Sequence, residues 1–91
     1  MNIHDFKDQD IIQFIDRNNS WITRFKSIDE KKLYIYDLAI NEGVNYDGLT
    51  WGNIGSITTC RYATPEEIEM FTKIEKERGI EIPITELYPI W

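Results

Sequence analysis

The sequence predicts an α+β fold, in which a small antiparallel β-sheet of four to five strands packs with one C-terminal α-helix. Residues 10 to 40 contain three runs that are rich in β-branched and aromatic side chains, and polar turns separate these runs. A fourth run of this kind covers residues 56 to 62, and a complete helix start follows at Thr64. At 91 residues the chain has room for one domain, residues 1–91, around one hydrophobic core.

The first two strands are predicted to form a β-hairpin over residues 10 to 27. Residues 10 to 16 have the composition of a strand, and the cluster Arg17-Asn18-Asn19-Ser20 favours a turn because Asn adopts positive φ at low cost. Residues 21 to 26 then alternate strictly between two faces. The set expected to face the core is Trp21, Thr23 and Phe25. The opposite set is Ile22, Arg24 and Lys26.

Two further strands are predicted on either side of a long loop. Residues 33 to 40 form a nearly continuous apolar run, for which a short helix is the alternative, but the Tyr-Ile-Tyr sequence favours a strand. From Asn41 to Gly55 the chain holds four of its five glycines among Asn, Asp, Tyr and Trp, which predicts a loop with tight turns. Residues 56 to 62 then resume as a strand because their β-branched content is high.

The capped helix is the clearest local pattern, and we assign it to residues 65–78. Thr64 can accept a hydrogen bond from the backbone N–H of Glu67, whose side chain can reach back to complete a capping box. Pro65 suits the first helical position, and Gly79 ends the helix. The apolar stripe of this helix consists of Ile68, Phe71 and Ile74.

The tail after Gly79 is apolar but contains Pro83 and Pro89, which exclude it from a central strand. We expect an edge strand or an extended segment. It would be costly to leave Tyr88, Ile90 and Trp91 in water, so the tail should dock on the domain or on a neighbouring chain. A homo-oligomer formed through the C-terminal tail is therefore expected.

Composition excludes several classes of function. Sixteen acidic against ten basic residues give a net charge of −6, whereas a nucleic-acid binder needs a basic face, so direct binding of nucleic acid is not expected. Cys60 is the only cysteine, which excludes an intrachain disulfide and a Cys-rich metal site and fits a reducing compartment. Neither a membrane span, which needs roughly 18 apolar residues, nor a signal peptide is present. We expect a cytoplasmic protein with no membrane partner.

The inventory of reactive groups argues against an enzyme. His4 is the only histidine and lies in an N-terminal stretch that we expect to be flexible, far from Cys60 in the sequence. The glycines lack the spacing of a phosphate-binding loop. The clustered carboxylates belong to the exposed face of the predicted helix. We therefore predict no catalytic residue, no metal and no cofactor.

Binding is better supported, because planar aromatic side chains occur together with guanidinium groups. Aromatic rings stack on bases and Arg holds phosphates bidentately, so a pocket of such residues could hold a nucleotide even on an acidic protein. For each aromatic residue a position in the core is the alternative. The residues predicted to bind a ligand are Trp21, Arg24, Tyr36, Trp51 and Arg61, with Tyr34 and Tyr46 as further candidates.

Three segments of the chain also carry a resemblance: DFKDQDIIQFIDRNNSWITRFKS, a tyrosine-bearing strand, and RYATPEEIEMFTKI. They resemble small proteins from phages and mobile elements of Bacteroidetes, in which an FKxxD-like opening and a Trp followed by a Phe precede a similar ATPEE helix. The match rests on Phe6, Lys7, Asp10, Trp21, Phe25 and the segment from Arg61 to Phe71. The resemblance implies an SH3-like barrel with an added helix, and it brings no established activity or site. Asp8-Gln9 departs from the Pro-Phe pair of the family.

Three functions remain open at this point. The first is a non-catalytic binding module, a phage-encoded inhibitor of host defence that sequesters a nucleotide-like signalling ligand. The alternative is a protein-interaction domain that binds and inhibits a host protein through the acidic helix 65–78 or the apolar tail. The third is a small structural or assembly protein. The expected partner is accordingly a nucleotide-like small molecule or a host protein, met in the cytoplasm of the host if the chain is phage-encoded.

Overall fold

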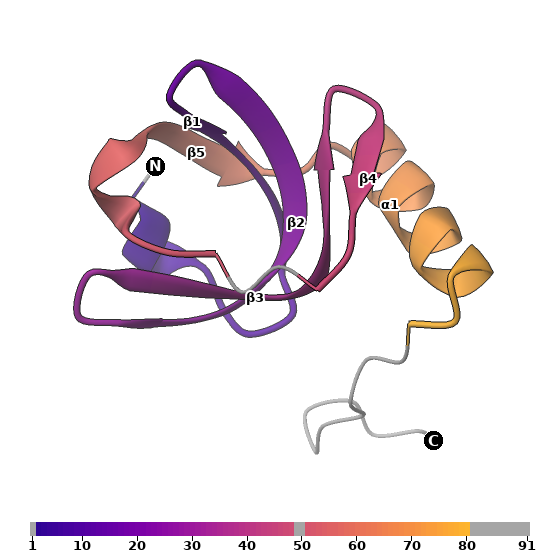
Figure 1. The fold of residues 1–91 in the computed structure, drawn as a ribbon, viewed down its shortest axis with the longest axis horizontal. Helices are drawn as coiled ribbons and strands as arrows, with labels where there is room; N and C mark the ends of the chain where they lie inside the picture. Colours follow the sequence, from indigo (N-terminus) through magenta and orange to yellow (C-terminus); the bar gives the residue numbers. More distant parts are fainter. Residues whose placement is uncertain (1, 49–50, 81–91) are drawn as a thin grey trace.

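We describe residues 2–48 and 51–80 of a computed structural model, which form a five-stranded antiparallel sheet followed by one α-helix (Figure 1). The predicted α+β fold is confirmed. The strands lie in the order β4-β3-β2-β1-β5, so β5 returns to pair with β1. The elements in chain order are η1 (Ile3–Asp5), β1 (Ile11–Asp16), β2 (Asn19–Asp29), β3 (Lys32–Asn41), β4 (Val44–Tyr46), η2 (Ile54–Ser56), β5 (Ile57–Tyr62) and α1 (Pro65–Glu77).

The sheet is strongly curved because β2 and β3 change register twice. These shifts lie between Thr23 and Phe25 and between Phe25 and Ser27, and such irregularities bend and twist the strands that contain them. After β4 the chain crosses to the start of β3, where the amide of Leu33 donates to the carbonyl of Gly52 at 2.8 Å. The sheet therefore curls into a partial barrel (Figure 1).

The inner face of the curved sheet carries the larger hydrophobic cluster, which we call the inner cluster. It consists of Phe6, Ile12, Phe14, Phe25, Leu33, Ile35, Ala39 and Cys60. Trp21 and Trp51 are partly buried and pack against it. The alternation predicted for β2 is confirmed, because Thr23 and Phe25 are buried whereas Lys26 is exposed.

α1 packs on part of the opposite face of the sheet, and the cluster between them is called here the helix cluster. It consists of the buried residues Ile11, Leu38, Ile40, Ala63 and Phe71, with Ile22, Ile74 and Ile80 partly buried against them. Phe71 is fully buried, so the predicted apolar stripe does attach α1 to the sheet. Among the residues described, no helix has the length and apolar composition that crossing a membrane would require.

The start of α1 agrees with the sequence. The Thr64 hydroxyl accepts the Glu67 amide at 3.2 Å, and the Glu67 carboxylate accepts the Thr64 amide at 2.8 Å, which completes the capping box. The helix ends at Glu77, with Arg78 as its C-cap and Gly79 at a φ of +68°. The predicted helix, residues 65–78, is thus correct to within one residue.

Two predictions about irregular segments were wrong. The loop predicted from Asn41 to Gly55 contains β4 and η2, because Glu42 and Gly43 both take positive φ and close a two-residue hairpin between β3 and β4. The N-terminal stretch is ordered, because Phe6 is buried in the inner cluster and fixes η1 beside the sheet. The prediction for the tail concerns positions beyond Ile80, outside the described residues.

Candidate functional site

The five residues predicted to bind a ligand lie in separate environments. Trp21 and Trp51 meet at the inner cluster. Arg24 and Tyr36 share the neighbour Gln9, whereas Arg61 lies at the start of α1. The structure thus brings together two pairs of the five and keeps Arg61 apart.

Trp21 and Trp51 are the centre of an aromatic group. Their ring centroids lie 4.7 Å apart in an edge-to-face arrangement, and Phe14 contacts Trp51 in the same way at 5.0 Å. Tyr46, a further sequence candidate, adds its ring to Trp21 at 5.5 Å. Since the rings pack on one another and on the inner cluster, their first role is to close this end of the barrel.

Arg24 links the sheet to α1. Its guanidinium donates to both carboxylate oxygens of Glu75, at 3.0 and 2.6 Å, and a third N–H donates to the carbonyl of Gln9 at 2.8 Å. The side chains of Arg24 and Glu75 are 14% and 7% exposed, so the pair is nearly removed from water. Because these hydrogen bonds satisfy the guanidinium inside the fold, Arg24 has little capacity left for a phosphate.

Tyr36 lies on the outside of β3 among polar groups. Its hydroxyl donates to Asp8 at 2.6 Å, and the Lys26 ammonium lies 5.6 Å from the centre of its ring. Burial, together with the hydrogen bond to Asp8 and the charge of Asp8, raises the pKa of Tyr36 to about 12. Tyr36 is therefore a hydrogen-bond donor at neutral pH and ties the N-terminal segment to the sheet.

Arg61 belongs to the face of the sheet that α1 covers. Gln13 pairs with Ile22 on one side and with Arg61 on the other, so these three side chains share a row, opposite to the face of Trp21. The Arg61 guanidinium donates to both oxygens of Glu67 at 2.7 and 3.2 Å. This hydrogen bond lowers the pKa of Glu67 and raises that of Arg61. The pair is partly exposed and supports the first turn of α1.

The reactive groups considered in the sequence stay apart from one another. Burial raises the pKa of the Cys60 thiol, which keeps it protonated at neutral pH. His4 is exposed in η1, and it is not among the residues that line the small hollow beside Cys60. No group of three or more His, Cys, Asp or Glu residues with metal-binding geometry occurs in the described part of the chain.

A concave surface lies between the first half of α1 and the sheet, and we call it the helix groove. It encloses about 270 Å³ and is lined by Ser20, Ile22, Ile40, Glu42, Gly43, Glu67 and Met70. Ile22, which is partly buried, and Ile40, which is 3% exposed, form its apolar floor at the margin of the helix cluster. Met70 is an apolar wall that residues 2–48 and 51–80 leave 37% exposed.

Two glutamates contribute negative charge to the helix groove, and they differ in their hydrogen bonding. Glu67 already accepts hydrogen bonds from Arg61 and from the Thr64 amide. Glu42 is exposed, and it has no hydrogen-bond or ion-pair partner among residues 2–48 and 51–80. An apolar floor with one unpaired carboxylate at its rim is suited to a ligand that is both apolar and cationic.

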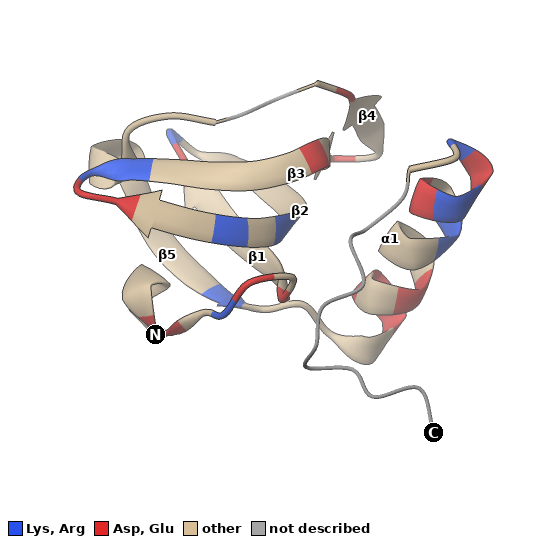
Figure 2. Cartoon of the chain, turned by 90° about the horizontal axis from the view of Figure 1, so that it is seen from below, with Lys and Arg blue, Asp and Glu red and all other residues tan. Residues whose placement is uncertain are grey.

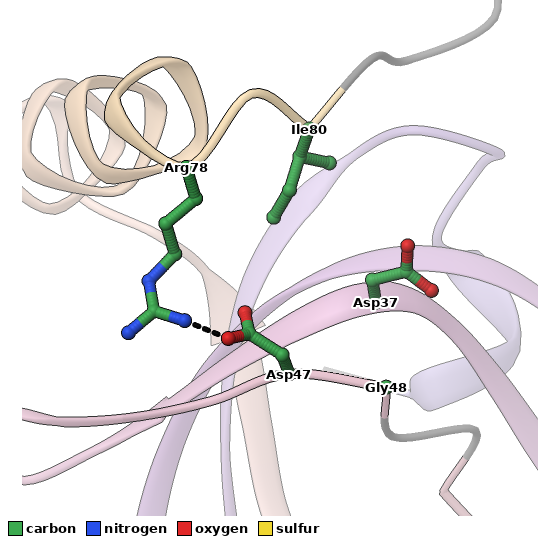
Figure 3. Close-up of a pocket in the computed structure, with 5 residues that line it drawn as sticks. All are labelled: Asp37, Asp47, Gly48, Arg78 and Ile80. Carbon is green, nitrogen blue, oxygen red and sulfur yellow. Dashed lines mark hydrogen bonds and ion pairs between the residues drawn. The ribbon is translucent and has the colours of Figure 1, made fainter.

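A second concavity, the C-terminal hollow, lies at the other end of α1 (Figure 3). It measures about 370 Å³ and is lined by Asp37 of β3, Asp47 and Gly48 after β4, and Arg78 and Ile80 after α1. Asp47 is hydrogen-bonded to Arg78, while Asp37 is exposed and has no polar partner within the described segments. This hollow therefore also combines an apolar side chain with an unpaired carboxylate.

Comparison with known proteins gives no relative for this chain. It matches no protein-family model, and neither a curated protein nor a solved structure matches it. The resemblance to the Bacteroidetes family stays a prediction. What can be said about the site depends on the contacts of the chain's own residues.

Sequence reasoning singled out the aromatic and arginine residues but missed the helix groove. Ile22 was correctly assigned to the face opposite Trp21, yet no sequence pattern indicated that α1 would leave part of this face uncovered. Glu42 and Gly43 fell within the predicted loop. From the sequence, a residue that only forms a turn cannot be distinguished from one that also lines a groove. Met70 lies outside the apolar stripe assigned to α1, and this exposed position was the one available signal.

Proposed function

We propose that this chain is a non-catalytic protein-interaction module that holds a basic and apolar segment of a partner protein in the helix groove. The observation that carries the proposal is the combination of the apolar floor, Ile22 and Ile40, with the exposed Met70 and the unpaired Glu42. An apolar side chain of the partner would remove Met70 and the exposed part of Ile22 from water. A neighbouring Lys or Arg would pair with Glu42.

The charge of the whole chain supports a cationic partner. The net charge is −6, and Figure 2 shows red acidic positions along much of α1, which forms one wall of the helix groove. Such a field attracts a positively charged segment over distances of about a Debye length, roughly 8 Å at physiological salt. Association should therefore weaken as the salt concentration rises.

The test is a titration of the isotope-labelled full chain with a short capped peptide of alternating leucine and lysine, followed by NMR. We expect saturable shifts of the amide signals of Ser20, Ile22, Ile40, Gly43 and Met70, and a smaller effect from a leucine–glutamate peptide of equal length. If neither peptide gives saturable shifts, or if the shifts map away from the groove, the proposal is wrong.

A matched pair of variants separates the site from general electrostatics. Glu42→Asn removes the carboxylate at the rim of the groove, while Asn remains favourable in a hairpin turn with positive φ. Glu30→Asn makes the same change in charge at a positive-φ residue in the turn between β2 and β3, which lies at the opposite end of β2 from Ser20. We expect Glu42→Asn to weaken the leucine–lysine peptide severalfold and Glu30→Asn to leave its affinity nearly unchanged.

The nucleotide hypothesis stays a prediction, and the aromatic group of Trp21, Tyr46 and Trp51 is the observation in its favour. It requires free cationic groups, whereas Arg24 and Arg61 are both hydrogen-bonded to carboxylates. Calorimetry with a panel of cyclic and linear nucleotides tests it directly. Binding that disappears in Arg61→Ala would favour a phage-encoded nucleotide sponge, acting in the host cytoplasm, over the protein-interaction module.

A further inference from the structure

The helix groove and the C-terminal hollow lie along one seam between α1 and β4. Met70 and Gly43 line the groove, and Arg78 and Asp47 line the hollow. From Met70 to Arg78 the helix rises by about 12 Å. From Gly43 to Asp47 the strand advances by about 13 Å. Since each concavity joins one end of this stretch of α1 to one end of β4, the two elements run in the same general direction, as in Figure 1.

The seam is apolar between its two ends. Ile22, which lines the groove, and Ile80, which lines the hollow, both belong to the margin of the helix cluster. Ile74 lies between them on α1 and is partly buried in the same cluster. The two concavities therefore both lie at the margin of the helix cluster.

Each end of the seam offers one carboxylate that has no polar partner among residues 2–48 and 51–80. Glu42 lies at the groove, and Asp37 lies at the hollow, where Figure 3 shows its side chain below Ile80. Asp47, the other acid of the hollow, is already hydrogen-bonded to Arg78. The pattern of the seam is thus an acid, an apolar stretch and a second acid.

We infer that the seam as a whole recognises an extended partner segment that carries two basic side chains about five residues apart, with apolar residues between them. The spacing follows from the two acids, because Asp37 in β3 and Glu42 just after it are five residues apart, which is about 17 Å of extended chain at roughly 3.3 Å per residue. An extended conformation fits because β4 is the end strand of the sheet. The inference depends on the proposed function and specifies the partner motif.

The experiment compares capped peptides of identical composition that differ only in the positions of two lysines. In one peptide the lysines are adjacent, and in the other they are five positions apart. Affinities for the full chain are measured by calorimetry at low and at physiological salt. We expect the spaced peptide to bind at least severalfold more tightly, because it alone reaches Glu42 and Asp37 together.

Variants then test which carboxylates cause the preference for the peptide with spaced lysines. Asp37→Asn should remove the advantage of the spaced peptide while leaving the adjacent-lysine peptide unaffected, and Glu30→Asn should preserve the advantage. Equal affinities of the two peptides, or an advantage that survives Asp37→Asn, would overturn the inference but leave the proposed function standing. Failure of both peptides to bind would remove the proposed function as well.

Discussion

The two faces of the sheet are packed in different ways. The inner face is closed by the curvature of the sheet itself, and its cluster draws side chains from β1, β2, β3 and β5 as well as Phe6 from the N-terminal segment. The opposite face depends on one helix, and its buried cluster is smaller. Closure by curvature leaves few gaps, whereas a single helix laid across a curved sheet leaves a margin uncovered. The candidate site lies at that margin.

The two ion pairs that attach α1 to the sheet show the same contrast. Arg24 and Glu75, near the C-terminal end of α1, are almost completely buried, whereas the Arg61 side chain, near the N-terminal end, is 47% exposed. A buried pair is costly to break because the remaining charge loses its partner away from water. An exposed pair is screened by solvent and contributes little. The helix is therefore held more firmly where it is remote from the groove.

The largest expected effect comes from truncating the centres of the two clusters. Phe14→Ala and Phe71→Ala each remove a fully buried ring and should each lower the free energy of unfolding by about 4 kcal/mol. The two variants should differ in where the fold loosens. Hydrogen exchange should show faster exchange throughout the sheet in Phe14→Ala, but mainly in α1 in Phe71→Ala. Identical exchange patterns would mean that the two clusters do not stabilise different parts of the fold.

The ion pairs give the next largest effect. Arg24→Ala should lower the free energy of unfolding by about 3 kcal/mol, because it leaves Glu75 buried without its partner. Arg61→Ala should cost less than about 1 kcal/mol. Urea denaturation of both variants, with Glu75→Ala to complete a double-mutant cycle, measures the difference. Comparable losses in Arg24→Ala and Arg61→Ala would contradict the contrast in burial.

High pH should weaken the fold through Tyr36. Its pKa is about 12 in the folded chain against an ordinary value of 10.0, so the protonated phenol is favoured by folding. This contribution is complete below pH 10 and is lost as the pH rises towards 12. Urea midpoints measured along this range should fall more steeply for the wild type than for Tyr36→Phe, which cannot ionise. Parallel curves would show that the hydrogen bond to Asp8 does not hold the phenol in its protonated form.

The smallest effect is a gain in stability at the groove. Glu42 takes positive φ in a hairpin turn where Asn is preferred, so Glu42→Asn should raise the free energy of unfolding by on the order of 0.5 kcal/mol. Thermal melts of the wild type, Glu42→Asn and Glu30→Asn measure this change in the free energy of unfolding. Together with the loss of peptide affinity proposed above, a gain would show that the native residue at this rim does not serve stability. A loss of stability would give Glu42 a structural role instead.

Interactions between residues close in the sequence were sufficient to predict much of this fold. The capping box of Thr64 and Glu67, the alternation from Trp21 to Phe25, and the hairpin turn after β1 all depend on residues close in the sequence. Their hydrogen bonds and turn preferences act within a few residues, so the sequence predicts them well. The hairpin formed by β3 and β4 was missed, because Glu42-Gly43 is a weak turn signal among several glycines.

The candidate site was decided by tertiary structure. Whether Arg24 meets a ligand or Glu75 depends on where α1 docks, and the docking position follows from the packing of Phe71 and Ile74 against distant strands. The same docking sets the helix groove and brings Asp37 and Asp47 to the end of α1. Thus the sequence by itself determined the four longer strands, the helix and their inward faces, since these follow from short-range periodicity. Only the assembled fold decided which charged groups are paired and which surfaces stay open, because those depend on contacts between residues far apart in the chain.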